Sequence, residues 1–431
     1  MEADVVIAGA GVAGLYTALN LPESAKIVMV TKAALDENDS FLAQGGICVL
    51  RDQSDYDSYF EDTMRAGHYE NNEKSVEIMI SSSPDIIRDL IGYGVEFARD
   101  KDGNLEYTKE GAHSKPRILF HKDITGNEIT SRLLAQVRKR KNIAIREYFT
   151  MVDIIEQDGK CVGIIGRTSS GKCEAIYAKF TMLATGGVGG LYTHSTNYRH
   201  LRGDSLAICK NHGVELENID YVQIHPTTLY SKKKGRRFLI SESVRGEGAI
   251  LLDANMNRFV DELLPRDLLT KEIEKQMAKD NAPYVWLSME SLGAETIKSH
   301  FPNIYKRCLE EGYDVTKECI PVVPAQHYFM GGIKVDEDSK TSMPNLYAAG
   351  ETSCNGVHGR NRLASNSLLE SLVFAKRAAL HMAKQIDRPI EYEPVEIDAE
   401  YYRDCDKRYA EIVREEMEKE SMEHGQYNDE A

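Results

Sequence analysis

The sequence lacks the features that mark secreted, membrane-spanning or nucleic-acid-binding proteins. It has no apolar run long enough to cross a bilayer, and no basic segment precedes its first apolar residues, so we expect neither a membrane span nor a secretory signal. The net charge of −15 disfavours a nucleic-acid partner, because the phosphate backbone attracts basic surfaces. A small anionic ligand is not excluded, since a cleft can carry a local field of opposite sign.

Cysteine pairs at metal-binding or redox spacing are also missing. The eight cysteines are scattered, and no two of them form a CxxC pair. We interpret them as free thiols in a reducing compartment, with no structural disulfide and no metal site, and therefore expect a cytoplasmic protein. The length of 431 residues and the hydrophobic fraction of 42% fit two or three domains with sizeable cores.

The N-terminus carries a nucleotide-binding pattern. A strand rich in Val and Ile at 4–8 leads into the turn Gly9-Ala10-Gly11-Val12-Ala13-Gly14, which is followed by a helix at 13–21 and a second strand at 26–31. In this order of elements, the glycines let the backbone approach a pyrophosphate that lies at the helix N-terminus. The pattern predicts that residues 9–14 bind a dinucleotide.

The second strand ends in Lys32 instead of the Asp or Glu that usually holds a ribose hydroxyl. A lysine at this position can contact a phosphate, or it can fold back over the adenosine. It can also be a plain solvated strand end. The residues alone leave these alternatives open.

Three further segments favour FAD over NAD as the dinucleotide. They are the glycine-rich stretch at 40–46, a strand at 181–187 that ends in a glycine pair, and Gly350-Glu351 after a returning strand. Each segment alone is also typical of an ordinary glycine loop. Glu351 can hold a ribityl hydroxyl, and a helix that begins near Ser365 can direct its N-terminal amides at the flavin.

The nucleotide-binding pattern stops in the middle of the chain. The intervening stretch includes the basic run 232–237, which we interpret as an exposed loop. Earlier in the chain, a separate helix is expected from Ser83-Pro84 to Gly94. We predict an α/β fold, in which a Rossmann-like FAD-binding domain is split by an α+β capping domain and followed by a short C-terminal helical tail. The predicted boundaries are 1–219 and 330–390 for the FAD-binding domain, 220–329 for the cap and 391–431 for the tail.

The motifs together resemble the succinate dehydrogenase and fumarate reductase flavoprotein family, in its branch that oxidises L-aspartate. The resemblance extends from the N-terminus to about residue 385. The segments that carry it are 9–14, 43–47, 110–114, 223–227, 245–249, 265–267, 327–332 and 358–369.

The resemblance implies FAD as the cofactor. The residues expected to contact it are Gly9, Ala10, Gly11, Val12, Ala13, Gly14, Lys32, Ser40, Phe41, Leu42, Ala43, Gln44, Gly45, Gly46, Val152, Thr185, Gly186, Asp204, Glu351, Ser367 and Leu368. On this basis Lys32 has a cofactor role. The membrane-bound relatives attach FAD through a histidine five positions before the glutamine, and Asp39 stands there in this chain, so we expect non-covalent FAD.

The resemblance also implies a cluster that binds and oxidises the substrate. The catalytic residues implied are Glu110, His225, Arg266, His327 and Arg362, and the further substrate contacts are Gln223, Thr227 and Ser241. Two arginines and two histidines suit two carboxylates, because Arg offers bidentate hydrogen bonds and His a charge that varies near neutral pH. Taken singly, each is more often a surface arginine or a core histidine.

Glu110 decides between related substrates. Aspartate differs from succinate by one ammonium group, which a carboxylate can hold, whereas the succinate and fumarate enzymes carry an apolar residue in the equivalent stretch. The alternative is a solvated glutamate.

Arg266 is assigned as proton donor and acceptor in the family, yet a guanidinium is hard to deprotonate. Either its pKa is depressed or it acts as an electrostatic clamp, and the residues leave both accounts open.

The expected reaction is oxidation of L-aspartate to iminoaspartate by hydride transfer from Cα to flavin N5. Oxygen or fumarate is the electron acceptor, and the product feeds NAD biosynthesis through quinolinate. A handover of the unstable imine to quinolinate synthase is an option that no residue shows. The alternatives are a soluble fumarate reductase of succinate-type dicarboxylates and a non-catalytic flavin-binding protein, which the intact Arg and His cluster disfavours.

Overall fold

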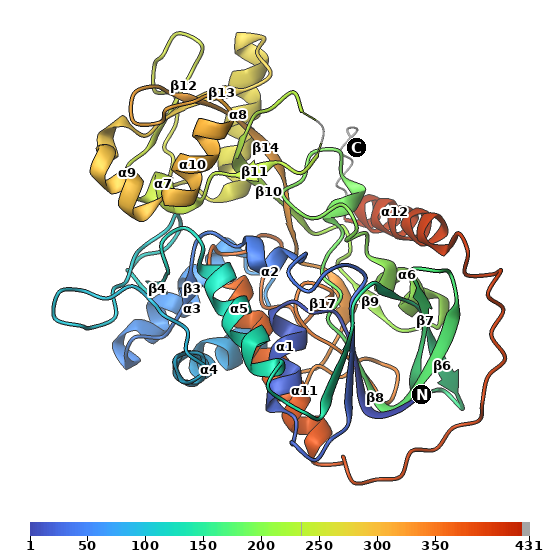
Figure 1. The fold of residues 1–431 in the computed structure, drawn as a ribbon. Coiled ribbons are helices and arrows are strands. Elements are labelled where there is room, and N and C mark those ends of the chain that lie inside the picture. The colour runs from blue at the N-terminus through green and yellow to red at the C-terminus, as the bar shows by residue number, and fades with distance from the viewer. Residues whose placement is uncertain (234, 425–431) are drawn as a thin grey trace.

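The computed structural model describes residues 1–233 and 235–424 (Figure 1). Its centre is a seven-stranded sheet in the order β5-β2-β1-β8-β7-β6, with β16 also paired to β8. The pairs that join β5, β2, β1, β8 and β16 are parallel, whereas β6, β7 and β8 pair antiparallel. The strands are β1 Glu2–Ala8, β2 Ile27–Val30, β5 Ile143–Arg146, β6 Phe149–Gln157, β7 Lys160–Thr168, β8 Cys173–Leu183 and β16 Leu346–Ala348.

The predicted strand–turn–helix–strand unit at the N-terminus is confirmed. β1 and β2 are parallel neighbours joined through α1 (Val12–Asn20). Successive side chains of β1 point to opposite faces of the sheet, and both faces are covered. Val5 and Ile7 belong to the hydrophobic core shared with α1 and α11, while Val6 and Ala8 belong to a second core shared with β6, β7 and α6.

Helices cover the sheet on both faces (Figure 1). α1 packs against α5 and α11, and α11 packs against α4, so these helices form one layer. The helices of this unit are α2 Asp39–Leu42, α3 Tyr56–Ala66, α4 Glu73–Gly92, α5 Thr125–Val137, α6 Asp204–Asn211, α11 Ser367–Ala383 and α12 Cys405–Glu423, with 3-10 turns at Gln53–Asp55 and Gly189–Leu191. Two small sheets accompany them, formed by β3 Ile47–Cys48 with β4 Ile118–Leu119, and by β9 Leu216–Glu217, β15 Gly332–Lys334 and β17 Ser353–Cys354.

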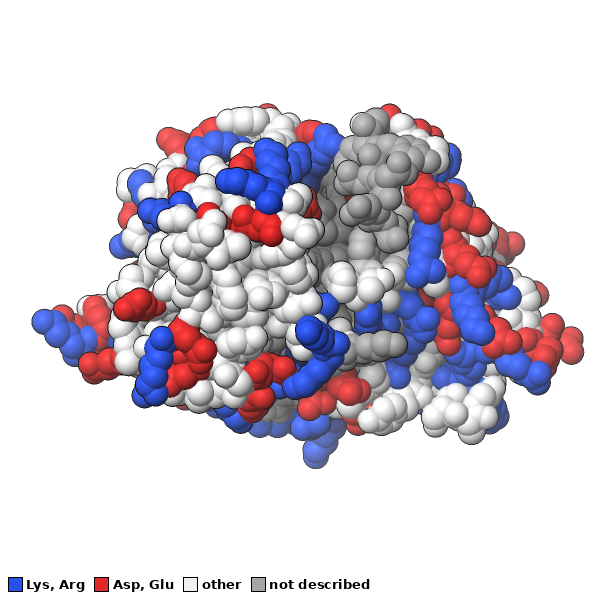
Figure 2. Space-filling view, turned by 90° about the horizontal axis from the view of Figure 1, so that it is seen from above, with Lys and Arg blue, Asp and Glu red and all other residues white. Residues whose placement is uncertain are grey.

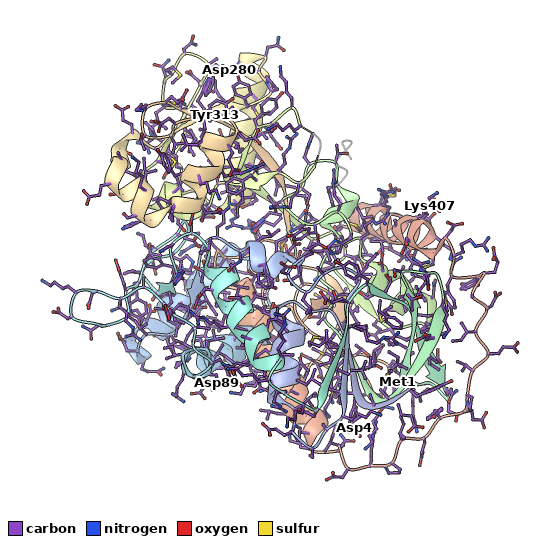
Figure 3. The ribbon with its side chains drawn as sticks, viewed as in Figure 1. Met1, Asp4, Asp89, Asp280, Tyr313 and Lys407 are labelled. Carbon is purple, nitrogen blue, oxygen red and sulfur yellow. The ribbon has the colours of Figure 1, made fainter. Side chains whose placement is uncertain are left out.

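A second unit, yellow in Figure 1, has its own five-stranded antiparallel sheet in the order β11-β10-β14-β13-β12 and its own hydrophobic core. Its strands are β10 Val222–Leu229, β11 Phe238–Leu239, β12 Ile250–Leu252, β13 Val285–Ser288 and β14 Ile320–Phe329. Its helices are α7 Glu242–Gly246, α8 Arg266–Asp280, α9 Ala294–His300 and α10 Pro302–Glu310, with a 3-10 turn at Glu290–Leu292. Figure 3 labels Asp280 at the end of α8 and Tyr313 in this unit, and in the first unit it labels Asp4 on β1 and Met1 directly before that strand. The exact domain boundaries stay a prediction.

The prediction that a helix begins at Ser83-Pro84 is wrong. That position lies inside α4, which begins ten residues earlier at Glu73 and is capped by the side chain of Asn72. Pro84 has no N–H to donate to the carbonyl of Ile80, and the hydroxyl of Ser83 donates to that carbonyl instead, at 2.7 Å. The serine therefore compensates for the proline within the helix.

The predicted helical tail begins with extended chain and turns and then forms α12, which packs on α6. Tyr409 of α12 donates a hydrogen bond of 2.6 Å to the carbonyl of Val152. Residues 425–431 of that predicted tail lie outside the described residues.

No helix in the described part of the chain is long and apolar enough to cross a membrane. On the face shown in Figure 2, acidic and basic side chains are interspersed, so this face does not form one continuous acidic surface.

We predict that replacing Gly14 by Ala destabilises the junction of β1 and α1. A Cβ at Gly14 would lie 2.1 Å from the carbonyl oxygen of Gly9, and that carbonyl is backbone that cannot rotate away. We expect Gly14→Ala to lower the free energy of unfolding by about 1–3 kcal/mol in urea titrations followed by circular dichroism. Gly92→Ala is the matched control, because nothing lies within 4 Å of its Cβ position. Equal stability of the two variants would contradict the prediction.

Candidate active site

A deep cleft opens where the parallel strands of the first unit end and the second unit faces them. Its wall includes Ala8, Thr31, Ala184 and Ala349, which lie at the carboxyl ends of β1, β2, β8 and β16. Ligands of open α/β sheets bind at this edge. The empty volume is about 1720 Å³ including its open mouth. Its wall extends from the glycine turn to Arg266 of the second unit, so the cleft spans both the sheet edge and the second unit.

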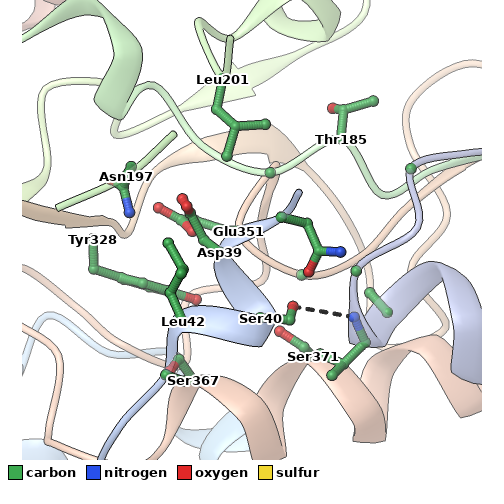
Figure 4. A pocket seen from close by; sticks show the side chains of 18 of the residues that line it. Asp39, Ser40, Leu42, Thr185, Asn197, Leu201, Tyr328, Glu351, Ser367 and Ser371 are labelled. Carbon is green, nitrogen blue, oxygen red and sulfur yellow. Dashed lines mark hydrogen bonds between the residues drawn. The ribbon is translucent and has the colours of Figure 1, made fainter. Parts of the chain in front are cut away.

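The glycine turn brings the N-terminus of α1 to the cleft. Gly9 has φ +115°, and a Cβ there would lie 1.9 Å from the carbonyl oxygen of Ala184, so only glycine allows this close crossing of β1 and β8. The backbone N–H of Val12 donates to the hydroxyl of Ser40 at 3.1 Å (Figure 4). The positive end of the helix dipole at this point suits a phosphate.

Lys32 is engaged within the cleft wall. Its ammonium forms an ion pair with Asp204 and donates to the carbonyl of His200 at 3.3 Å. Asp406 of the tail lies 3.8 Å away. The alternative of a plain solvated strand end is therefore disfavoured, because the side chain bridges β2 to the start of α6.

Two acidic side chains lie side by side in the same cleft (Figure 4). Asp39 accepts a hydrogen bond from the N–H of Tyr198 at 3.0 Å, and Glu351 accepts one from the N–H of Phe329 at 3.0 Å. Burial raises the pKa of Asp39 to about 7. Burial, and then the negative charge of Asp39, raise the pKa of Glu351 to about 8. Near neutral pH this pair therefore carries a proton and can donate a hydrogen bond as well as accept one.

The second unit contributes a buried ion pair. Arg266, the first residue of α8, donates from Nε to Glu242 at 2.7 Å and from Nη1 to the side-chain oxygen of Gln223 at 2.8 Å. Burial works to raise the pKa of Glu242, but the charges of Arg266 and Arg245 outweigh burial and lower it. Arg245 lies 3.6 Å from the same carboxylate. Glu242 therefore stays ionised between two guanidinium groups.

The two histidines of the cluster are neutral, which corrects the expected variable charge near neutral pH. Burial, and then the positive charges of Arg266 and Arg362, hold the pKa of His327 well below its usual range. Burial and Arg266 do the same for the pKa of His225. The rings lie 5.1 Å apart, and Nε2 of His225 is buried and without a partner among residues 1–233 and 235–424. These imidazoles therefore offer hydrogen bonds to a ligand and no fixed charge.

Glu110 and Arg362 complete the cluster on the side of the first unit. Glu110 is buried and accepts hydrogen bonds from Ser243 at 2.7 Å and from Ser365 at 2.6 Å. Burial, and then the charge of Glu242, raise the pKa of Glu110. Burial lowers the pKa of Arg362 to about 10, and its Nε has no hydrogen-bond partner in the described part of the chain. The reading of Glu110 as a solvated surface residue is therefore wrong.

The structure brings most of the predicted residues to one cleft. Five of them do not line it: Gly14, Phe41, Val152, Gln223 and Thr227. Gly14 packs against the turn, Gln223 acts through Arg266, and the backbone N–H of Thr227 approaches Nδ1 of His225 at 3.2 Å. Val152 is fully buried in the second core.

The cleft also contains residues that sequence reasoning missed. Glu242 directly follows the predicted Ser241, but nothing in the local pattern distinguishes it from a surface glutamate. Arg236 of the exposed basic run reaches the cleft wall and donates to the carbonyl of Thr196 at 3.3 Å. Both belong to the second unit, so their position depends on how this unit sits over the sheet.

Comparison with known proteins agrees with this geometry. The sequence pattern of the family described as the FAD binding domain matches residues 4–368. An L-aspartate oxidase of Clostridium perfringens is 53% identical over 386 residues, which cover 89% of this chain and 88% of its own. An L-aspartate oxidase of Pseudomonas aeruginosa is 40% identical over 405 residues, covering 89% and 75%. This chain belongs to the L-aspartate oxidase family of flavoproteins.

Solved structures confirm the predicted fold class for this family member. A quinol fumarate reductase chain of E. coli superposes with a TM-score of 0.85 at 28% identity, covering 96% of this chain and 74% of that chain. The Sdh1 protein of Mycobacterium smegmatis superposes with a TM-score of 0.77 at 33% identity, covering 91% and 70%.

The cofactor is FAD, and the residues present fit it. Buried oxygen atoms of Asp39, Gln44 and Asp204 line the cleft without a partner among the described residues, as expected where a ligand with hydroxyl and amide groups binds. The glycine turn leaves room for a phosphate to lie against the backbone. Glu351 lines the same cleft, where a carboxylate can accept hydrogen bonds from the hydroxyls of a polyol chain. Ser367 and Leu368 place the N-terminus of α11 against the same cleft.

We predict that Lys32→Met weakens FAD binding about tenfold, because it leaves Asp204 unpaired beside the phosphate-binding turn. The measurement is titration of apoprotein with FAD, followed by quenching of flavin fluorescence. Lys376→Met is the matched control, since Lys376 forms a comparable ion pair with Asp89 at 2.5 Å away from the cleft. An unchanged affinity for Lys32→Met would show that Lys32 only ties β2 to α6.

Proposed function

We propose that this protein oxidises L-aspartate to iminoaspartate with FAD, and that oxygen or fumarate takes up the electrons. The observation that carries the proposal is a carboxylate, Glu110, buried in the same cleft as Arg266, Arg362 and two neutral histidines. A ligand with two carboxylates and one ammonium group matches this set. When bound non-covalently, FAD supplies the hydride acceptor of the reaction. Asp39 stands where a covalent attachment would need an imidazole.

The arginines and histidines hold the two carboxylates. Nε of Arg362 and Nε2 of His225 have no partner among the residues that the structure describes. Both side chains are buried, and a hydrogen bond to a charged ligand is worth more there than it is in water. Tyr328 supports Arg362 from below, with its ring centroid 4.6 Å from the guanidinium carbon. Together these groups hold the ligand in one orientation.

Arg266 acts as an electrostatic clamp. Its Nε is committed to Glu242 and its Nη1 to Gln223, so two bonds fix the guanidinium plane in the cleft. The ion pair with Glu242 keeps the guanidinium beside the cleft, where its positive charge attracts a carboxylate. Glu242 lies between Arg266 and Arg245 and holds both guanidinium groups in place beside the cleft.

The proposal also covers the location of the protein and the fate of its product. The eight cysteines are free in the structure, which supports a reducing, cytoplasmic location. We also propose that the iminoaspartate, an unstable imine, passes transiently to quinolinate synthase for NAD biosynthesis. The chemistry of the product supports this handover, and no contact on the described surface does.

A soluble fumarate reductase is the second candidate, because the E. coli quinol fumarate reductase chain superposes over 96% of this chain. The two candidates are separated by anaerobic mixing of the holoenzyme with L-aspartate, D-aspartate or succinate while the flavin absorbance is followed. We expect L-aspartate to bleach the flavin and D-aspartate to leave it oxidised. Bleaching by succinate alone would overturn the aspartate assignment.

We predict that Glu110→Gln lowers kcat/KM for L-aspartate about a hundredfold while fumarate reduction falls no more than about threefold. The amide keeps the shape and the contacts to Ser243 and Ser365, but it loses the charge that pairs with the ammonium. Steady-state kinetics with both substrates measure the two values. An equal fall in both activities would show that Glu110 has a structural role and does not bind the ammonium group.

A further inference from the structure

Ser365 has an unusual backbone conformation at the edge of the cleft. It lies just before α11, is 7% exposed, and has φ +63°, in the left-handed region that non-glycine residues rarely adopt. Holding a serine there costs about 1–3 kcal/mol and persists only where the surrounding contacts require it. The contacts of this residue therefore point to what its conformation serves.

The hydroxyl of Ser365 connects two parts of the site. It donates to Oε2 of Glu110 at 2.6 Å and accepts from the backbone N–H of Gly46 at 3.2 Å. Its carbonyl accepts from the N–H of Cys48 at 3.0 Å. The Ser365 hydroxyl thus donates its single hydrogen to Glu110 and accepts a hydrogen bond from the glycine-rich segment 40–46, which lines the cofactor cleft.

His113 fixes the loop of Glu110 to the same turn from the other side. Nη1 of Arg117 donates to Nδ1 of His113 at 3.0 Å, so Nε2 carries the proton and donates to the carbonyl of Ala364 at 3.0 Å. Burial lowers the pKa of His113 to about 4, so this neutral tautomer is present at physiological pH. The loop of Glu110 and the turn of Ser365 are therefore held as one rigid piece.

We propose that Ser365 is a positioning residue that selects the amino-acid substrate, because it holds the Glu110 carboxylate beside the cofactor-binding segment where the substrate ammonium is bound. The inference rests on the proposed function of Glu110. Ser243 holds the other oxygen, Oε1, from the second unit. Ser365 connects the Glu110 carboxylate to the cofactor side of the cleft.

A pH profile distinguishes positioning from a general structural role. Burial raises the pKa of Glu110, whereas the hydrogen bond from Ser365 lowers it. Removing the hydroxyl raises that pKa further, so kcat/KM for L-aspartate, which needs ionised Glu110, declines at a higher pH on the acidic side. The charged and titratable groups that face Glu110 from the neighbouring segments are Cys48, His113, Glu242, Arg245, Arg266 and Arg362. None of them is changed by the substitution.

The test compares Ser365→Ala with Ser339→Ala in the holoenzyme. Ser339 is a matched control: it is also buried, has φ +60°, and donates its hydroxyl to the carbonyl of Phe374 at 3.1 Å, outside the cleft. We expect Ser365→Ala to lower kcat/KM for L-aspartate about tenfold more than it lowers fumarate reduction. The acidic limb of the aspartate profile shifts to higher pH, and Ser339→Ala changes neither.

Ser365→Gly is the second variant, because glycine adopts φ +63° without strain and keeps the turn if alanine disturbs folding. The same selective loss is expected. In a Glu110→Gln background, adding Ser365→Gly changes the aspartate rate no further, since the carboxylate it positions is gone. Additive effects, or an unshifted pH profile, overturn the inference. If Glu110→Gln itself loses both activities equally, the proposed function of Glu110 fails instead.

Discussion

Arg266 and Glu242 form a buried ion pair, and the arrangement of the cleft depends on it. The guanidinium is 7% exposed and the carboxylate 3%, so each charge would be without water if the other were absent. Breaking such a pair by removing one partner destabilises a protein by about 3–5 kcal/mol. This requirement ties the start of α8 to α7, and through Gln223 to β10. The second unit therefore presents a preformed face to the cleft.

The charges around this pair compensate one another. Three guanidinium groups, those of Arg245, Arg266 and Arg362, face two carboxylates, those of Glu110 and Glu242. Burial, and then the excess of positive charge, hold the pKa values of the histidines low, and the positive charge suits a ligand that brings two negative charges. Because water is largely excluded, these interactions act at a low effective dielectric constant and discriminate strongly between ligands of different charge.

Glu110 is where the two units meet. One of its oxygens accepts from Ser243 in the second unit and the other from Ser365 in the first. Neither unit alone forms the whole cleft, because His225, His327 and Arg266 come from β10, β14 and α8, while the glycine turn belongs to the parallel sheet. A displacement of one unit relative to the other would separate Glu110 from one of its two partners.

Local patterns in the sequence predict the parts of this protein that depend on neighbouring residues. The glycine turn, the apolar strands 4–8 and 346–348 and the helix that follows the latter were all predictable, since each has a periodicity or a glycine with a local cause. The same local reasoning failed at Ser83-Pro84, which has the pattern of a helix start. The compensating hydrogen bond to Ile80 and the earlier cap at Asn72 were not recognisable from the dipeptide.

The sequence by itself determined the class of cofactor and the set of candidate residues, because glycine spacing and residue chemistry are local properties. Only the tertiary structure decided what surrounds those residues. It showed that His225 and His327 are neutral, that Glu110 is buried between two serines, and that Glu242 holds Arg266. These properties depend on desolvation and on charges brought together from segments far apart in the chain, and no window of the sequence contains that information.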